Sequence, residues 1–214
     1  MNPIDTDNTT KPSTVKVWDW PVRVFHWTLA ASVLGAFFTG ENEDFERLHQ
    51  TLGWVAAGLM GSRVVWGLVG TRYARFAEFV RSPAQVWAYI KSLRSGQPQH
   101  FVGHNPVGAV AVILLMGLTA LSVYTGWLAL AEGAAEWLEE AHEIAAHALI
   151  AVVLVHVIGV LWSSHTHGEN LLKAMLTGRK AAPSEAAGIH HNWGVLGLAM
   201  LLAVAWYMFV ELRT

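Results

Sequence analysis

Histidines are the residues of this chain whose types and spacing could do chemistry. Among its eleven histidines, four that lie in long apolar stretches are the candidates for chemistry: His26, His49, His142 and His156. A polar side chain in such a stretch is costly to bury and therefore marks a functional site. His142 and His156 are 14 residues apart, which on a helix is about 40° short of four full turns and about 21 Å along the axis. Both therefore face nearly the same way at different depths.

Imidazole nitrogens bind metals, and a low-spin b-type haem takes one imidazole on each side of its iron. The chain has no cysteine. This excludes disulfides, cysteine-bound iron–sulfur clusters, thiolate zinc sites and covalently attached c-type haem. Haem b is held without a covalent bond and needs no thiol. Bis-histidine haem b is therefore the chemistry that these histidines favour.

The elements that must position the histidines are membrane-spanning helices. Only 14% of residues are charged and 53% are hydrophobic, against about 25% charged in ordinary soluble domains. A spanning helix needs about 20 mostly apolar residues. Five windows meet this requirement: Val22–Gly40, Leu48–Gly70, Pro106–Leu130, Ala141–Trp162 and Trp193–Val210. The sequence therefore predicts an all-α integral membrane protein.

Basic residues next to the spans predict the orientation, because they accumulate on the cytoplasmic side. One side carries Lys11, Lys16, Arg23, Arg72, Arg75, Arg81, Lys91, Arg94, Lys173, Arg179 and Lys180. The other side carries only Arg47 and Arg213, with acidic loops at 41–46 and 132–140. The N-terminus is therefore expected in the cytoplasm and the C-terminus in the periplasm. The formal net charge of -2 gives no reason to expect a nucleic-acid partner.

Depth in the membrane pairs the four histidines. With this orientation His49 and His142 lie level near the outer surface, and His26 and His156 lie level towards the cytoplasm. Two stacked pairs from facing helices are what two bis-histidine haems require. Arg23, one turn before His26, is expected to neutralise a haem propionate.

The remaining histidines are interpreted as structural. His147 is about 140° around the helix from His142 and is not counted as a ligand. A solvated position at the cytoplasmic edge is expected for His100, His104, His165, His167, His190 and His191. Zinc or copper binding by His165 and His167 would be a weak alternative. Many tryptophans, Trp18 and Trp66 among them, are interpreted as an interfacial belt.

The polar segments complete the predicted organisation. Residues 1–16 form a cytoplasmic tail without a signal peptide, 17–180 the haem-binding domain, and 181–214 a linker with the fifth span. The stretch near 75–95 has apolar residues at helical spacing between charges, which is typical of a helix lying in the membrane interface; a solvated loop is the alternative. Residues 164–190 are expected to be a polar connection. Small residues at Gly53, Ala57 and Gly61 leave a shallow face for a macrocycle or, more simply, for helix packing.

The assembled motifs resemble the bacterial cytochrome b561 family and the b-type cytochrome subunits of nickel–iron hydrogenases and formate dehydrogenases. The matching segments are 20–27 (Trp-Pro-Val-Arg-Val-Phe-His-Trp), 47–49 (Arg-Leu-His), 103–108 (Gly-His-Asn-Pro-Val-Gly), His142, His156, 169–171 (Glu-Asn-Leu) and 174–180 (Ala-Met-Leu-Thr-Gly-Arg-Lys). The resemblance implies a four-helix bundle with two haems b, His26 and His156 binding one and His49 and His142 the other. It also implies quinone exchange near one haem. The fifth helix is additional to this core and is expected to pack against it.

The predicted function is electron transfer by an inner-membrane dihaem cytochrome between the quinone pool and a periplasmic partner. That partner would be a c-type cytochrome or a dehydrogenase or hydrogenase subunit, which the acidic outer loops would dock. Two alternatives remain open. One is a stand-alone quinone oxidoreductase acting on a small oxidant such as superoxide; the other is a transporter lined by histidines.

Overall fold

Five long apolar helices dominate the computed structural model, which describes residues 13–96, 99–182 and 188–213. Each is long and apolar enough to cross a membrane. They are α1 (Trp20–Thr39), α2 (Glu46–Val69), α5 (Pro106–Ala129), α6 (Glu136–His167) and α8 (Gly194–Glu211). The all-α membrane fold with five spans is therefore confirmed. Residues 1–12 of the expected N-terminal tail lie outside the described residues.

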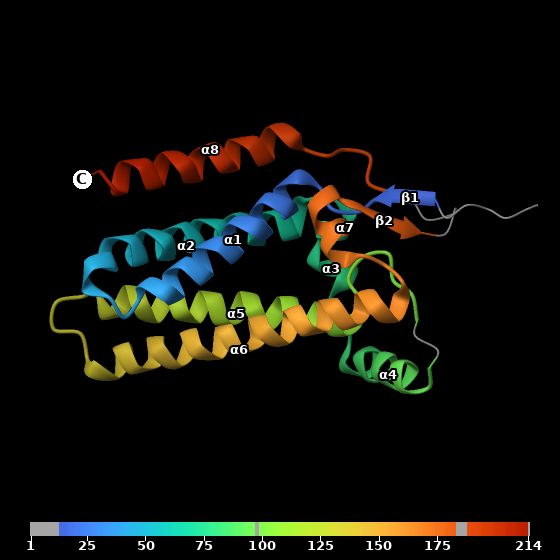
Figure 1. Ribbon diagram of the computed structural model, residues 1–214, viewed down its shortest axis with the longest axis horizontal. Helices are drawn as coiled ribbons and strands as arrows, with labels where there is room; N and C mark the ends of the chain where they lie inside the picture. Colours follow the sequence, from blue (N-terminus) through green and yellow to red (C-terminus); the bar gives the residue numbers. More distant parts are fainter. Residues whose placement is uncertain (1–12, 97–98, 183–187, 214) are drawn as a thin grey trace, which may run out of the picture.

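Apart from the 3-10 helix η1 (Glu43–Phe45), the short elements gather at one end of the bundle, called here the ribbon end (Figure 1). They are β1 (Ser13–Lys16), the 3-10 helix η2 (Arg72–Ala74), α3 (Phe76–Phe79), α4 (Pro83–Arg94), α7 (Leu171–Thr177) and β2 (Arg179–Ala182). β1 and β2 form an antiparallel ribbon in which Lys16 pairs with Arg179. The opposite end, called the far end, holds the connections 40–45 and 130–135. α1 and α5 begin at the ribbon end, whereas α2 and α6 begin at the far end.

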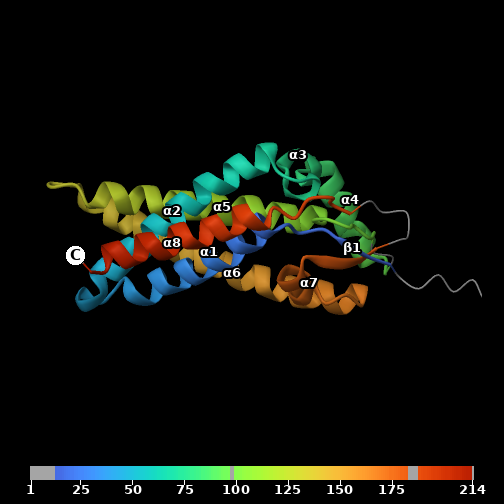
Figure 2. The same ribbon diagram turned by 90° about the horizontal axis from the view of Figure 1, so that it is seen from above.

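The spans form two helical hairpins, α1 with α2 and α5 with α6 (Figures 1 and 2). α2 and α5 approach each other between the hairpins, and α8 packs across α1 and α2. Phe25 of α1 and Leu59 of α2 lie in one apolar cluster with Val204 of α8. A Cβ atom added to Gly197 of α8 would come within 2.8 Å of the Trp20 side chain. α8 is thus a packing helix laid against the first hairpin.

Asp19 fixes the start of α1. Its side chain accepts a hydrogen bond from the Val22 amide (2.9 Å), which caps the helix, and Pro21 occupies the first turn. The other carboxylate oxygen accepts from Trp66 Nε1 (2.9 Å) and Thr71 Oγ1 (2.6 Å). Asp19 is fully buried. One carboxylate therefore joins the beginning of α1 to the end of α2.

Gly178 joins α7 to the segment that precedes α1. It ends α7 with φ of +79°, a conformation that favours glycine. Its carbonyl oxygen accepts hydrogen bonds from the amides of Val17 (2.8 Å) and Trp18 (3.1 Å). A Cβ atom here would lie 2.5 Å from the Trp18 carbonyl oxygen. The contact therefore requires glycine on both conformational and steric grounds.

The ribbon end is more ordered than the sequence predicted. The expected connection 164–190 contains the last turn of α6, the helix α7 and strand β2. The expected interfacial helix near 75–95 is split into α3 and α4, because Ser82 caps a new helix whose first residue is Pro83. Trp18 does not belong to an interfacial belt, because it is only 6% exposed. Trp66 is half-buried and donates to Asp19.

Candidate haem sites

His49 and His142 form the far-end pair, one from each hairpin. Their ring centroids are 5.9 Å apart, with an interplanar angle of 86°. Nδ1 of His49 donates to the Ala36 carbonyl oxygen, and Nδ1 of His142 donates to the Ser122 carbonyl oxygen, both at 2.8 Å. A carbonyl oxygen can only accept, so each Nδ1 carries the proton. In the neutral ring this tautomer leaves Nε2 as the nitrogen available to bind a metal.

Gly126 of α5 makes room for His142. A Cβ atom at this position would lie 2.8 Å from Nδ1 and 2.9 Å from Cε1 of the His142 ring. Such distances are too short for a real contact, so any larger residue must push the ring away. The other ring of the pair has a glycine beside it as well. A Cβ atom added to Gly40, at the end of α1, would lie 3.2 Å from His49 Cε1.

Gly126→Val is therefore expected to weaken cofactor binding at the far-end pair by roughly tenfold, the effect typical of lost ligand orientation. Haem content per chain after detergent purification measures it. Gly117→Val is the matched control on the same helix, because nothing lies within 4 Å of a Cβ atom there. Equal haem content in the two variants would contradict the role given to Gly126.

His26 and His156 form the ribbon-end pair, again one from each hairpin. Their ring centroids are 6.5 Å apart, with an interplanar angle of 55°. Nδ1 of His26 is buried and has no hydrogen-bond partner among the described residues. The Trp27 ring packs edge-on against His26 at 4.9 Å. This pair therefore differs from the far-end pair, in which both Nδ1 atoms are bound to carbonyl oxygens.

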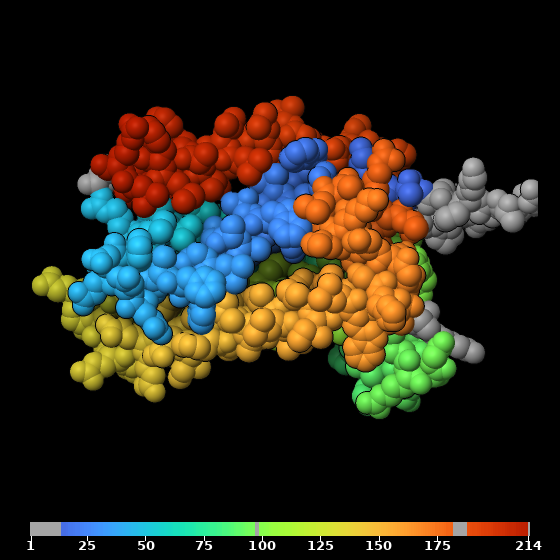
Figure 3. All heavy atoms as spheres, viewed as in Figure 1, coloured from blue at the N-terminus to red at the C-terminus, as the bar shows by residue number. Residues whose placement is uncertain are grey.

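Both pairs fit a metal ion between the rings. A metal–imidazole bond is about 2 Å long, which places the ring centres of two opposite ligands roughly 6 Å apart. The centroid distances of the two pairs, 5.9 and 6.5 Å, bracket this value. Figure 3 shows a hollow between α1 and α6 with deeper atoms visible behind it. Beside α2, Cβ atoms added to Gly53 or Gly61 would meet nothing within 4 Å. The residues therefore fit a flat group held between the hairpins.

Arg23 points towards the end of α7. Its Nε donates to the Met175 carbonyl oxygen (3.3 Å), and one terminal nitrogen donates to the Leu176 carbonyl oxygen. The guanidinium also lies 4.9 Å from the Trp20 ring centroid. The propionate contact expected of Arg23 remains a prediction, since two of its donors already bind carbonyl groups.

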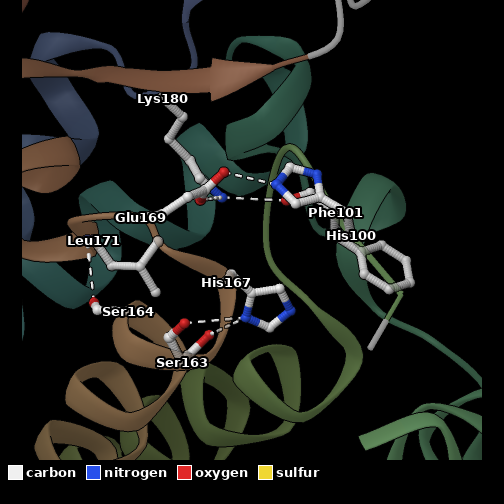
Figure 4. Close-up of polar contacts among 8 residues, drawn as sticks. All are labelled: His100, Phe101, Ser163, Ser164, His167, Glu169, Leu171 and Lys180. Carbon is white, nitrogen blue, oxygen red and sulfur yellow. Dashed lines mark hydrogen bonds and ion pairs between the residues drawn. The ribbon is translucent and has the colours of Figure 1, made fainter. Parts of the chain in front are cut away.

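A buried ion pair lies at the ribbon end, where Lys180 of β2 meets Glu169, which follows α6 (Figure 4). Lys180 Nζ lies 3.2 Å from Glu169 Oε2 and donates to the Phe101 carbonyl oxygen at 3.1 Å. Glu169 Oε1 lies 2.6 Å from His100 Nε2. The Lys180 side chain is only 6% exposed. Glu169 therefore supplies the negative charge that a buried ammonium requires.

His104 differs from its expected solvated position. Its ring lies 4.7 Å from that of Trp18 and 4.6 Å from that of Phe79, and Nδ1 is buried without a partner among the described residues. Burial, and then the charges of Arg63 and Lys180, lower the pKa of His104 to about 3. The expectation of a solvated His104 is wrong, because Trp18 and α3 fold over the loop before α5. His165, His190 and His191 are exposed.

The sequence analysis missed Arg63, a buried arginine within α2. Its residue is 4% exposed, and its Cζ lies 4.8 Å from the Phe76 ring centroid, 5.9 Å from that of Phe25 and 6.0 Å from that of Phe79. Nη1 has no hydrogen-bond partner among the described residues. An arginine inside an apolar span is itself a signal of a functional site.

Comparison with known proteins assigns the family. A model of the prokaryotic cytochrome b561 family matches residues 17–178, which include α1 to α7 and all four paired histidines. The chain belongs to the prokaryotic cytochrome b561 family. Membership of this cytochrome family implies haem b binding and membrane electron transfer. α8 lies outside the matched region.

Relatives of this cytochrome b561 family member include probable Ni/Fe-hydrogenase B-type cytochrome subunits. The protein of that name from Rhodobacter capsulatus is 23% identical, the match covering 82% of this chain and 85% of the relative. The one from Azotobacter vinelandii is 25% identical, covering 78% and 89%. No solved structure matches the chain.

Proposed function

We propose that this chain is a dihaem b-type cytochrome of the bacterial inner membrane that transfers electrons between the quinone pool and a periplasmic redox partner. The observation that carries the proposal is the presence of two histidine pairs at opposite ends of one bundle. Each pair joins the two hairpins, and each has the ring spacing of two ligands on one metal ion. A haem held by each pair would give electrons a route through the membrane, which a single site would not provide.

The protein's task in this proposal is to hold and tune two haems. Haem b, when bound, supplies reversible one-electron transfer at its iron. His26 and His156 would hold one haem and His49 and His142 the other. The carbonyl groups of Ala36 and Ser122 orient the far-end rings and raise the basicity of Nε2. Apolar side chains of both hairpins exclude water, which influences the reduction potential.

The charges at the two ends support an orientation with the ribbon end in the cytoplasm. Basic side chains are concentrated on α4 and in the segments before it and after α7. The far-end connections carry exposed acidic side chains: Glu41, Glu43, Asp44, Glu46, Glu132, Glu136, Glu139 and Glu140. An acidic face of this kind suits a basic periplasmic partner. The proposed partner is a c-type cytochrome or a dehydrogenase or hydrogenase subunit, and the similarity to hydrogenase cytochrome subunits supports a redox-enzyme partner.

Quinol oxidation in vesicles tests the proposed function. The chain is reconstituted in liposomes containing a quinol, and a basic c-type cytochrome is added outside as the acceptor. We expect quinol-dependent reduction of the acceptor, which falls several-fold between low and physiological salt because surface charges are screened.

Variants separate this role from its alternatives. His49→Ala should abolish the reaction, and Glu43→Gln with Asp44→Asn should slow it at low salt only. Acceptor reduction that is independent of quinol would contradict the proposal. Rapid oxidation by superoxide with no reaction of the protein acceptor would instead support the stand-alone oxidoreductase.

A further inference from the structure

We propose that Arg63 and His104 form a carboxylate-binding site that holds a propionate of the haem at the ribbon-end pair. The inference rests on the proposed function, because it requires haem between His26 and His156. It adds two residues, from α2 and from the loop before α5, to a site otherwise built by α1 and α6.

Helical geometry places Arg63 at the depth of the ribbon-end pair and close to the face of α2 that carries His49. Arg63 follows His49 by 14 residues on α2, the same spacing that separates His142 from His156 on α6. The residue is therefore rotated only about 40° from His49 and lies about 21 Å further along the helix. α2 runs from the far end to the ribbon end, so this step reaches the ribbon-end pair. The contact with Phe25, the neighbour of His26, agrees with this placement.

The buried guanidinium of Arg63 has no ion-pair partner in the part of the chain that the structure describes. It lies among the rings of Phe25, Phe76 and Phe79, and its Nη1 has no partner among the described residues. A buried cation without a hydrogen-bonded anion is strongly destabilising. Asp19 is near enough for its charge to act on Arg63. Its oxygens, however, accept hydrogen bonds from Val22, Trp66 and Thr71.

His104 supplies a second unsatisfied polar atom next to the same ring. Both His104 and Arg63 pack against Phe79, and Nδ1 of His104 is also buried without a partner among the described residues. His104 also lies near His26 and His156 in the fold. Arg63 and His104 thus border the ribbon-end pair with two free positions for hydrogen bonds.

A carboxylate satisfies this arrangement better than the other groups available. Arginine binds a carboxylate through two parallel N–H···O bonds and gains charge neutralisation as well. A quinone carbonyl would accept a hydrogen bond but would leave the charge uncompensated. Bulk water is excluded because Arg63 is 4% exposed. Haem brings two propionates to the place where the histidine pair holds its iron.

Arg63→Gln tests the proposal, since glutamine keeps hydrogen-bonding capacity and removes the charge. We expect the ribbon-end haem to transfer to a haem scavenger such as apomyoglobin at least tenfold faster than in the parent protein. Its midpoint potential should fall, because a positive charge favours the reduced haem. The far-end haem should keep its spectrum and potential, which reports correct folding within the same sample. Arg47→Gln, at an exposed position on the same helix, is the matched control.

Two further variants keep the test decisive if Arg63→Gln loses both haems. Arg63→Lys retains the charge without the planar donor pair, and His104→Leu removes the second polar atom; each should loosen the ribbon-end haem by a smaller factor. Unchanged haem transfer and potential in these variants would overturn the proposal. So would a change in quinol KM alone, which would place a quinone at Arg63, or the expected effect appearing in Arg23→Gln instead. A parent protein without haem would refute the proposed function itself.

Discussion

Replacing His142 with alanine is expected to remove one of two haems and to leave the other in place. His49→Ala should give the same one-haem protein, because both side chains belong to the far-end pair. His26→Ala and His156→Ala should each remove the other haem. Loss of one axial ligand breaks the bond on one side of the iron and leaves the opposite histidine without its function. Extracted haem per chain and the reduced-minus-oxidised spectrum of each variant measure the result.

His147→Ala is the control for these four variants. His147 lies five residues after His142, is exposed, and donates from Nδ1 to the Glu143 carbonyl oxygen of its own helix at 2.9 Å. The variant should therefore keep both haems. If His147→Ala lost a haem while His142→Ala kept both, the pairing would be wrong. The pairing would also be contradicted if His49→Ala and His142→Ala lost different haems, or if His26→Ala and His156→Ala did.

Asp19→Ala is expected to destabilise the ribbon end more than any other single change outside the histidines. The variant leaves the Val22 amide, Trp66 Nε1 and Thr71 Oγ1 without their acceptor in a fully buried position. An unsatisfied buried donor costs about 1 kcal/mol or more, so the sum is on the order of 3 kcal/mol. This corresponds to a fall in melting temperature of roughly 10 °C. Thermal unfolding in detergent, followed by circular dichroism, measures it.

Two companion variants separate the hydrogen bonds of Asp19 from general effects of charge. Asp44→Ala removes an exposed acid at the far end and should leave the melting temperature unchanged. Asp19→Asn keeps one acceptor oxygen and should lie between the parent protein and Asp19→Ala. If Asp19→Ala had the same melting temperature as the parent protein, Asp19 would not hold α1 to α2.

Much of the fold followed from local properties of the sequence. The length of the apolar segments identified all five spans. A helix that crosses a membrane needs a continuous run of apolar residues, and this run is visible in the sequence without any knowledge of tertiary contacts. Because the rise per residue of a helix is fixed, spacing in the sequence gives depth in the membrane. The pairing of His142 with His49 therefore needed no tertiary information. The structure places those rings 5.9 Å apart. Their role as haem ligands remains a prediction.

The ribbon end could not be predicted in the same way, because its contacts join distant parts of the chain. His104 is half-buried against Trp18, which lies 86 residues earlier, and Asp19 binds Thr71 across 52 residues. No local pattern encodes such contacts. Arg63 is different, because an arginine 14 residues after His49 inside an apolar run is visible in the sequence. Its position inside an apolar span is the signal that identifies it.

A reduced-minus-oxidised visible spectrum of the detergent-purified chain, combined with extraction and counting of haem, tests the central claim most directly. Two low-spin b haems per polypeptide are the predicted result, since each histidine pair would then hold one iron. A correctly folded preparation without colour would contradict the account and favour a transporter whose histidines carry protons or metal ions.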